Sequence, residues 1–251
     1  MAETNNNNNS VELINVSKTY KVYERSSASP LDKILNVLRG SKAKSFNALE
    51  NINLNIKKGE FFGIIGHNGS GKSTLLNIIS KAIPPNKGGT VNLNSSFTKL
   101  KLGLGFNQQL TARQNIYLTG SILGLRIKEI DIKLDTILEF AGVTKFKDTP
   151  LKYFSSGMRS RLGFSIALYA KSEILLLDEF IGGVGDLDFK AKAEKAFDEM
   201  ILNGRTIIFV SHSMTMVKKM CSRVLLLHHG EQIKIGHPNE VVELYEKDYK
   251  K

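Results

Sequence analysis

The 251-residue chain contains a single cysteine, Cys221, and this scarcity limits the kinds of site that it can build. One cysteine excludes a disulfide within the chain, and no second type of metal ligand lies beside it at the usual spacing. We therefore expect Cys221 to be a small buried residue without a chemical role.

The sequence also lacks long apolar runs. No stretch approaches the roughly 18 to 20 residues that cross a bilayer, and the asparagine-rich start at residues 5–9 does not resemble a secretory signal. We therefore expect a cytoplasmic protein whose residues 1–10 form a disordered tail.

Acidic residues are fewer than basic ones: the chain has 24 aspartates and glutamates and 35 lysines and arginines, which gives a formal net charge of +11. Such an excess is found in proteins that bind nucleic acids or anionic membranes. Here the lysines are scattered, as on an ordinary solvated surface, and the dense basic tail is confined to residues 246–251. We expect no nucleic-acid partner; salt-sensitive DNA binding would instead indicate a nucleic-acid-binding regulator.

Short apolar runs outline the predicted fold, a single domain over residues 11–245. The runs 11–16, 52–56 and 90–93 predict a small antiparallel sheet near the N-terminus. The remaining runs show no polar alternation, which is typical of strands buried on both faces of a parallel sheet covered by helices. These runs are 61–65, 174–177, 207–210, 224–227 and the weaker 233–235. The fold class is therefore α/β, with a mostly parallel core sheet.

A helical subdomain is predicted to interrupt the sheet at about residues 107–171. Thr111 and Gln114 have the spacing of a capping box, and Gly142 ends a later helical run. The apolar positions of that run share one face: Ile130, Leu134, Ile137, Leu138 and Ala141.

A further helix is predicted at residues 30–39, between the first two strands. Ser29 suits the N-cap, Pro30 the first helical position and Gly40 the end. The helix carries an apolar stripe of Leu31, Ile34, Leu35 and Leu38. Two interpretations are open: the stripe packs on the protein's own core, or it docks on another subunit or on a membrane surface.

Residues 66–73 read Gly-His-Asn-Gly-Ser-Gly-Lys-Ser between a strand pattern and a helix pattern, which is the spacing of a phosphate-binding loop. The glycines let the backbone curl, so that its N–H groups and the positive end of the helix face one anion. Lys72 is predicted to reach the β and γ phosphates of a nucleoside triphosphate, and the Ser73 hydroxyl to bind Mg²⁺. The predicted binding residues are Gly66, His67, Asn68, Gly69, Ser70, Gly71, Lys72, Ser73 and Thr74.

Polar side chains follow two of the buried strands, where open parallel sheets bind their ligands. Asp178 is predicted to hold the magnesium shell, and Glu179 to orient and deprotonate the attacking water. The alternative is that both carboxylates cap the next helix. His212 is predicted to donate a hydrogen bond to the γ phosphate or to the water.

The other histidine side chains have no partners at metal spacing along the sequence. We expect structural roles for the side chains of His67, His228, His229 and His237.

Residues 154–158 read Phe-Ser-Ser-Gly-Met and open a helix predicted at 158–171. Ser155, Ser156 and Gly157 would form a second anion-binding surface at its N-terminus. With the phosphate loop and the carboxylate strand, this segment makes residues 11–245 similar to the nucleotide-binding subunits of ATP-binding cassette (ABC) transporters, whose signature there reads Leu-Ser-Gly-Gly-Gln. The departures from that signature resemble the branch that exports lipid-linked polysaccharides.

The resemblance implies roles for further residues. Tyr20 would stack on the adenine of ATP, with an interfacial tyrosine as the alternative. Gln108, or else Gln109, would be the glutamine that senses magnesium. Asp186, or else Asp188, would contact the other subunit.

The resemblance also implies partners and a location. Two copies of the chain would hold each ATP between the phosphate loop of one and residues 155–157 of the other. Two transmembrane permease subunits would bind this pair at the cytoplasmic face of the inner membrane. The exported substrate would be a lipid-linked polysaccharide, and O-antigen is the polysaccharide that we expect. The helix at 30–39 would lie near the membrane. The alternative function is a soluble single-cassette ATPase, such as a scaffold for iron–sulfur cluster assembly.

Overall fold

The structure, a computed structural model, describes residues 8–22, 44–101, 105–178 and 187–249. Within these ranges one nine-stranded sheet runs in the order β4-β1-β2-β9-β8-β3-β7-β6-β5. Its strands are β1 (Asn9–Val22), β2 (Lys44–Lys57), β3 (Phe61–Ile65), β4 (Thr90–Leu93), β5 (Phe97–Lys101), β6 (Ile174–Asp178), β7 (Thr206–Val210), β8 (Arg223–His228) and β9 (Glu231–Gly236).

The sheet has a parallel part and an antiparallel part. Strands β5, β6, β7, β3 and β8 pair in parallel, whereas β1 pairs antiparallel with both β2 and β4. Strand β9 joins the parts, because it is antiparallel to β8 and pairs in parallel with β2. The predicted α/β class with a mostly parallel core is confirmed.

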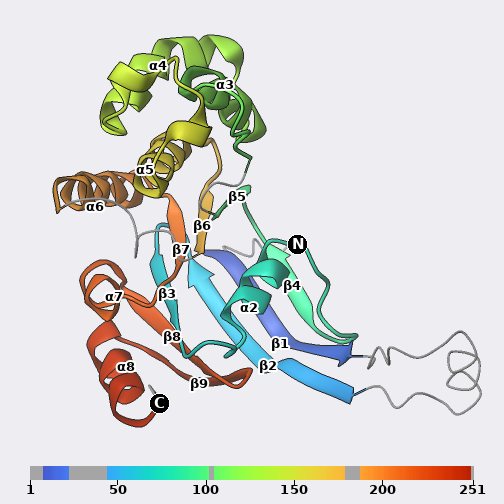
Figure 1. The fold of residues 1–251 in the computed structure, drawn as a ribbon. Coiled ribbons are helices and arrows are strands. Elements are labelled where there is room, and N and C mark those ends of the chain that lie inside the picture. The colour runs from blue at the N-terminus through green and yellow to red at the C-terminus, as the bar shows by residue number, and fades with distance from the viewer. Residues whose placement is uncertain (1–7, 23–43, 102–104, 179–186, 250–251) are drawn as a thin grey trace, which may run out of the picture.

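Helices cover both faces of the parallel part (Figure 1). Helix α2 (Lys72–Ile79) lies on one side, and α6 (Leu187–Leu202), α7 (Met214–Met220) and α8 (Pro238–Leu244) lie on the other. Successive residues of the central strands enter different cores: Phe61 and Ile65 pack with the α6–α8 side, Phe62 and Ile64 with the α2 side. Burial on both faces explains why these strands read as unbroken apolar runs.

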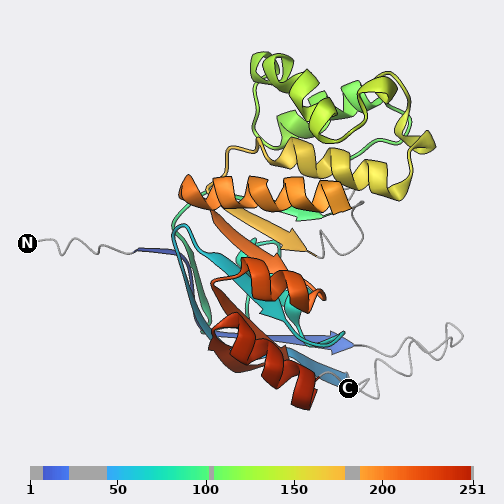
Figure 2. The ribbon, with the colours of Figure 1, turned by 90° about the vertical axis from the view of Figure 1, so that its left-hand side faces the viewer.

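A helical lobe stands at one end of the molecule (Figure 2). It contains α3 (Ala112–Ile122), α4 (Ile127–Phe140), α5 (Ser156–Ala167) and two short 3₁₀ turns, Thr144–Phe146 and Leu151–Tyr153, and has its own apolar core. The capping box at Thr111 and Gln114 is present, and the predicted apolar face of α4 is buried. Among the described residues, no helix combines the length and apolar character needed to span a membrane.

Some predicted boundaries were wrong. Asn9 and Ser10 belong to β1 rather than to a tail, because Asn9 pairs with Lys57 of β2; the buried Ser10 Oγ atom lies 2.8 Å from Thr206 Oγ1. Residues Tyr245–Tyr249 continue α8 as a π-helical turn, which includes part of the predicted basic tail. Helix α5 begins two residues before the predicted start, since Ser155 caps it, and ends earlier, at Ala167. The predicted helix at 30–39 lies outside the described residues.

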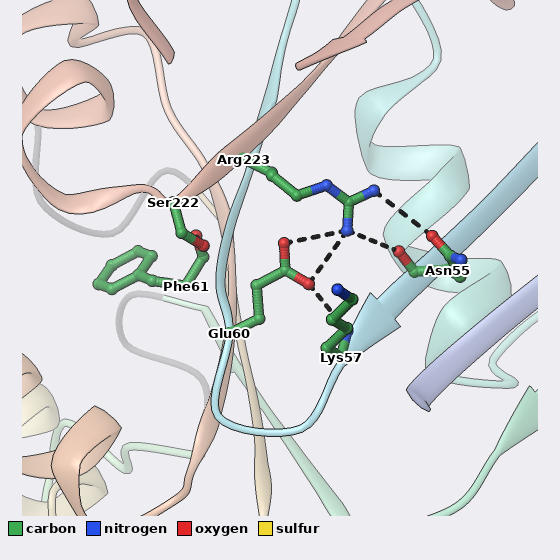
Figure 3. Close-up of polar contacts among 6 residues, drawn as sticks. All are labelled: Asn55, Lys57, Glu60, Phe61, Ser222 and Arg223. Carbon is green, nitrogen blue, oxygen red and sulfur yellow. Dashed lines mark hydrogen bonds and ion pairs between the residues drawn. The ribbon is translucent and has the colours of Figure 1, made fainter. Parts of the chain in front are cut away.

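An ion pair fastens the start of β3 to the start of β8 (Figure 3). Arg223 Nη1 lies 3.2 Å and 3.3 Å from the two carboxylate oxygens of Glu60, a side chain that is almost fully buried. The backbone N–H of Lys57 donates to the same carboxylate at 2.8 Å, and Arg223 also donates to Asn55. Because the buried charge is paired and hydrogen-bonded, it holds these two strands in register without an unsatisfied group. The opposite ends of these strands carry the candidate site.

Candidate functional site

The phosphate loop turns sharply out of β3 and passes close to β8. Gly66 has φ 152°, and a Cβ atom there would lie 2.2 Å from the backbone oxygen of Leu227. A side chain at this position would therefore collide with the neighbouring strand, which explains the glycine in physical terms. The loop leads directly into α2, which begins at Lys72.

Lys72 is buried, with 5% of its surface exposed, and its ammonium group lies inside the loop. Its Nζ donates hydrogen bonds to the carbonyl oxygens of Gly66 at 2.8 Å and His67 at 2.9 Å. The positive charge is thus held at the centre of the loop, at the N-terminus of α2. Loop backbone, helix end and ammonium together form a strongly anion-attracting site.

A cavity of about 360 Å³ opens beside the loop. It is lined by Tyr20, Phe46, Ala48, Asn68, Gly69, Gly71, Lys72, Ser73 and Thr74. The structure therefore brings Tyr20, predicted from the first strand, together with the loop some fifty residues later. Both ends of a nucleotide find suitable chemistry here: an aromatic face and a phosphate cradle.

Sequence reasoning missed Phe46, which lies opposite Tyr20 where β1 pairs with β2. The two rings are partly exposed, at 38% for Tyr20 and 56% for Phe46, so neither is committed to the core. The ammonium of Lys18 lies 5.6 Å from the centre of the Tyr20 ring. Its aromatic side chain was the only sequence signal for Phe46. Its place beside Tyr20 follows from the register between β1 and β2, which the sequence alone does not give.

The predicted catalytic residues follow strands that end at the same edge as β3. Asp178 is the last residue of β6 and pairs with Val210, the last residue of β7; Val210 in turn pairs with Ile64 of β3. Asp178 is half-buried, and His212 is exposed two residues after β7. Parallel register therefore carries Asp178 and His212 to the loop's side of the sheet. Glu179 lies outside the described residues.

The predicted signature residues lie in the helical lobe. Ser155 caps α5, and its Oγ accepts a hydrogen bond from the backbone N–H of Met158 at 3.1 Å. Ser155 and Ser156 are exposed, and Gly157 is half-buried. None of the three belongs to the described lining of the cavity beside the loop. Within one chain, the two predicted anion-binding surfaces are therefore separate.

Gln108 and Asp188 are not among the described residues that line the cavity. Gln108 is exposed in the turn before α3, where its backbone carbonyl accepts a hydrogen bond from Lys152 at 2.9 Å. Asp188 is exposed in the first turn of α6, and Asp186 lies outside the described residues. The roles proposed for Gln108 and for either aspartate stay predictions.

Comparison with known proteins agrees with this geometry. A family profile described as ABC transporter matches residues 49–182. An O-antigen export system ATP-binding protein of Klebsiella pneumoniae is 37% identical over 238 residues, which make up 94% of this chain and 96% of that protein. A teichoic acids export ATP-binding protein of Lactiplantibacillus plantarum is 42% identical over 237 residues, 94% of this chain and 64% of that longer protein.

Solved structures of cassettes share the fold. A dimeric ATP-binding cassette in a post-hydrolysis state with ADP and phosphate superposes with a TM-score of 0.73 at 25% identity, covering 91% of this chain and 98% of that one. The ATP-binding subunit of an ABC transporter gives a TM-score of 0.74 at 19% identity over 94% of this chain and 93% of that one. The chain belongs to the ABC transporter family, and it is an ATPase of that family.

Proposed function

We propose that this chain is the ATP-hydrolysing subunit of an exporter that moves a lipid-linked polysaccharide across the inner membrane. The observation that carries the proposal is the cavity in which Tyr20 faces the loop containing Lys72 and Ser73. The relatives named for O-antigen export and teichoic acids export support the class of cargo. O-antigen is the first cargo to test, and teichoic acid is the alternative.

ATP would lie along this cavity with its base on Tyr20 and its phosphates in the loop. Lys72 would exchange its bonds to the loop carbonyls of Gly66 and His67 for bonds to the β and γ phosphates. This exchange keeps the buried ammonium paired in both states, so that the charge is never left without partners.

The donor set suits Mg²⁺. The exposed Ser73 hydroxyl and the half-buried Asp178 carboxylate supply the hard oxygen atoms that this ion prefers, and Gln108 would add an amide oxygen. When bound, Mg²⁺ would neutralise charge on the phosphate oxygens during transfer to water. Glu179 would orient and deprotonate that water, and His212 would donate a hydrogen bond to the γ phosphate.

Two copies of the chain would close on ATP. The separation of the phosphate loop from residues 155–157 within one chain supports this arrangement, because a second copy can bring its Ser155, Ser156 and Gly157 to the open side of the nucleotide. The exposed N-terminus of α5 would then offer N–H groups to the phosphates. Hydrolysis would release the pair, and two transmembrane permease subunits at the cytoplasmic face would convert that motion into transport.

A complementation experiment tests the cargo and the partnership together. The chain and its candidate permease are expressed in two strains, one lacking its O-antigen exporter and one lacking its teichoic acid exporter, and surface polysaccharide is measured. The proposal predicts restored O-antigen with the wild-type chain and none with Lys72→Ala. Restoration of teichoic acid alone would reassign the cargo. A chain that hydrolyses ATP but restores neither polymer and never fractionates with membranes would contradict the proposal and favour a soluble ATPase.

A further inference from the structure

Three histidines that are far apart in the sequence meet beside the phosphate loop. The ring of His67 lies 4.8 Å from that of His228 and 4.6 Å from that of His229, and the last two rings are 4.3 Å apart. One nitrogen atom of each side chain lies within 4.8 Å of the other two. The sequence spacing had indicated only structural roles for them, because His67 is separated from the pair by about 160 residues.

The sheet topology brings this cluster together. Strands β3 and β8 are parallel neighbours, so the loop after β3 and the residues that end β8 lie at the same edge. His229 and Gly230 form a tight turn to β9, both with positive φ, at 46° and 86°. The backbone N–H of Gly230 donates to the carbonyl of Ser70 at 3.0 Å, which fixes this turn against the loop.

The ring nitrogens are arranged as ligands rather than as members of a hydrogen-bond network. His67 Nδ1 lies 2.6 Å from the carbonyl oxygen of Asn68, so Nδ1 carries the proton and Nε2 keeps its lone pair. His67 Nε2 and His228 Nδ1 are buried, and neither has a hydrogen-bond partner among the described residues. A metal-binding histidine commonly donates its second N–H to a backbone carbonyl in this way.

The cluster is also accessible to an ion. His229 is exposed, so the cluster is open to solvent on one side. Bonds of about 2.0 Å in a tetrahedral site hold nitrogen atoms about 3.3 Å apart, so side-chain rotation must bring the three donors closer by at most about 1.5 Å.

We propose that His67, His228 and His229 form a binding site for a divalent transition-metal ion such as Zn²⁺, Co²⁺ or Ni²⁺, with water completing its coordination. Imidazole nitrogen is a ligand for this class of ion and not for Mg²⁺, so the site is chemically distinct from the oxygen donors that would hold the magnesium of ATP. The ion would join the phosphate loop to the β8–β9 turn. Without nucleotide, His67 would be held from both sides, since its carbonyl oxygen accepts a hydrogen bond from Lys72.

Titration of the tag-free full chain with Co²⁺ tests the site directly. The wild type is expected to bind one ion per chain with the visible absorption bands of tetrahedral cobalt, and Zn²⁺ is expected to displace it. His229→Asn is the informative variant, because the side chain is exposed and asparagine tolerates a positive φ. His237→Asn is the matched control, since His237 caps α8 outside the cluster.

The proposal predicts that His229→Asn and His228→Gln each weaken the binding of Co²⁺ at least about tenfold, while His237→Asn binds it as tightly as the wild type. Zn²⁺ should also raise the melting temperature of the wild type and of His237→Asn, but not of His229→Asn. Circular dichroism confirms that each variant is folded. Absence of stoichiometric binding by the wild type, or unchanged binding by folded His229→Asn, would overturn the proposal.

Discussion

Replacing Tyr20 with alanine tests whether the cavity beside the loop holds a nucleotide base. The side chain lies at the cavity, 38% exposed, and contacts Lys18 through a cation–π interaction at 5.6 Å. Its removal should therefore cost the fold only about 1 kcal/mol or less. Stacking of a base on an aromatic ring is worth about 1 to 3 kcal/mol, which corresponds to a loss of about 5- to 150-fold in affinity for ATP.

The assay compares three ligands. Dissociation constants for ATP, GTP and inorganic tripolyphosphate are measured by calorimetry in the presence of Mg²⁺. Tyr20→Ala should weaken ATP and GTP to a similar extent, because every base has a π face, and leave tripolyphosphate unchanged, because the loop is untouched. Phe146→Ala, which removes a comparably exposed ring from the helical lobe, is the control and should change none of the three. Equal losses for all three ligands would mean that Tyr20 supports the loop rather than the base.

Three further predictions concern the reaction and the stability of the fold. Glu179→Gln should retain ATP binding and slow steady-state hydrolysis by about 10²- to 10⁴-fold, the usual worth of a positioned base; near-normal turnover would remove Glu179 from that role. Gly66→Ala should lower the free energy of unfolding in urea by about 3 kcal/mol or more, because the added Cβ would lie 2.2 Å from a backbone oxygen. Gly69→Ala has open space around it and only the strain of a φ of 81°, so it should lower that free energy by about 1 to 2 kcal/mol. Equal losses for the two variants would contradict the crowding at Gly66. Hydrogen bonds from Lys171, and then from the backbone and side chain of Arg126, lower the pKa of Glu129 from 4.5 to about 2. The ionised carboxylate therefore stabilises the fold fully above pH 4.5, and this stabilisation is lost as pH falls to about 2. The difference in unfolding free energy between the wild type and Glu129→Gln should shrink across that window, and a constant difference would argue against the ion pair.

Elements that are marked by a short local pattern, such as an unbroken apolar run or a capping box, could be predicted from the sequence. The central strands are apolar on both faces because both faces are covered, and the Thr111 capping box marked the start of α3. The phosphate loop could be recognised because its glycines and lysine act within eight consecutive residues.

The strand ends and site residues that the sequence did not predict depend on pairing between strands that are far apart in the chain. Strands β1 and β2 extend well beyond their predicted apolar runs because they pair with each other, and asparagines with positive φ, Asn15 and Asn51, lie near the irregularities in that ladder. In strand β5 the apolar residues are separated by threonine and lysine, so the strand was not predicted from an apolar run. Its parallel pairing with β6 defines it. Phe46 and the histidine cluster were hidden for the same reason: strand register, not sequence proximity, brings their members together.

In the proposed mechanism, two copies of this chain close around ATP, and each supplies the surface that the other lacks. Sedimentation velocity of Glu179→Gln with saturating Mg²⁺ and ATP, in the presence of the candidate permease, measures whether this pair forms. We expect a nucleotide-bound dimer of the chain that dissociates when ADP replaces ATP, and no dimer for Ser155→Arg. A variant that remains monomeric with ATP fully bound would contradict it.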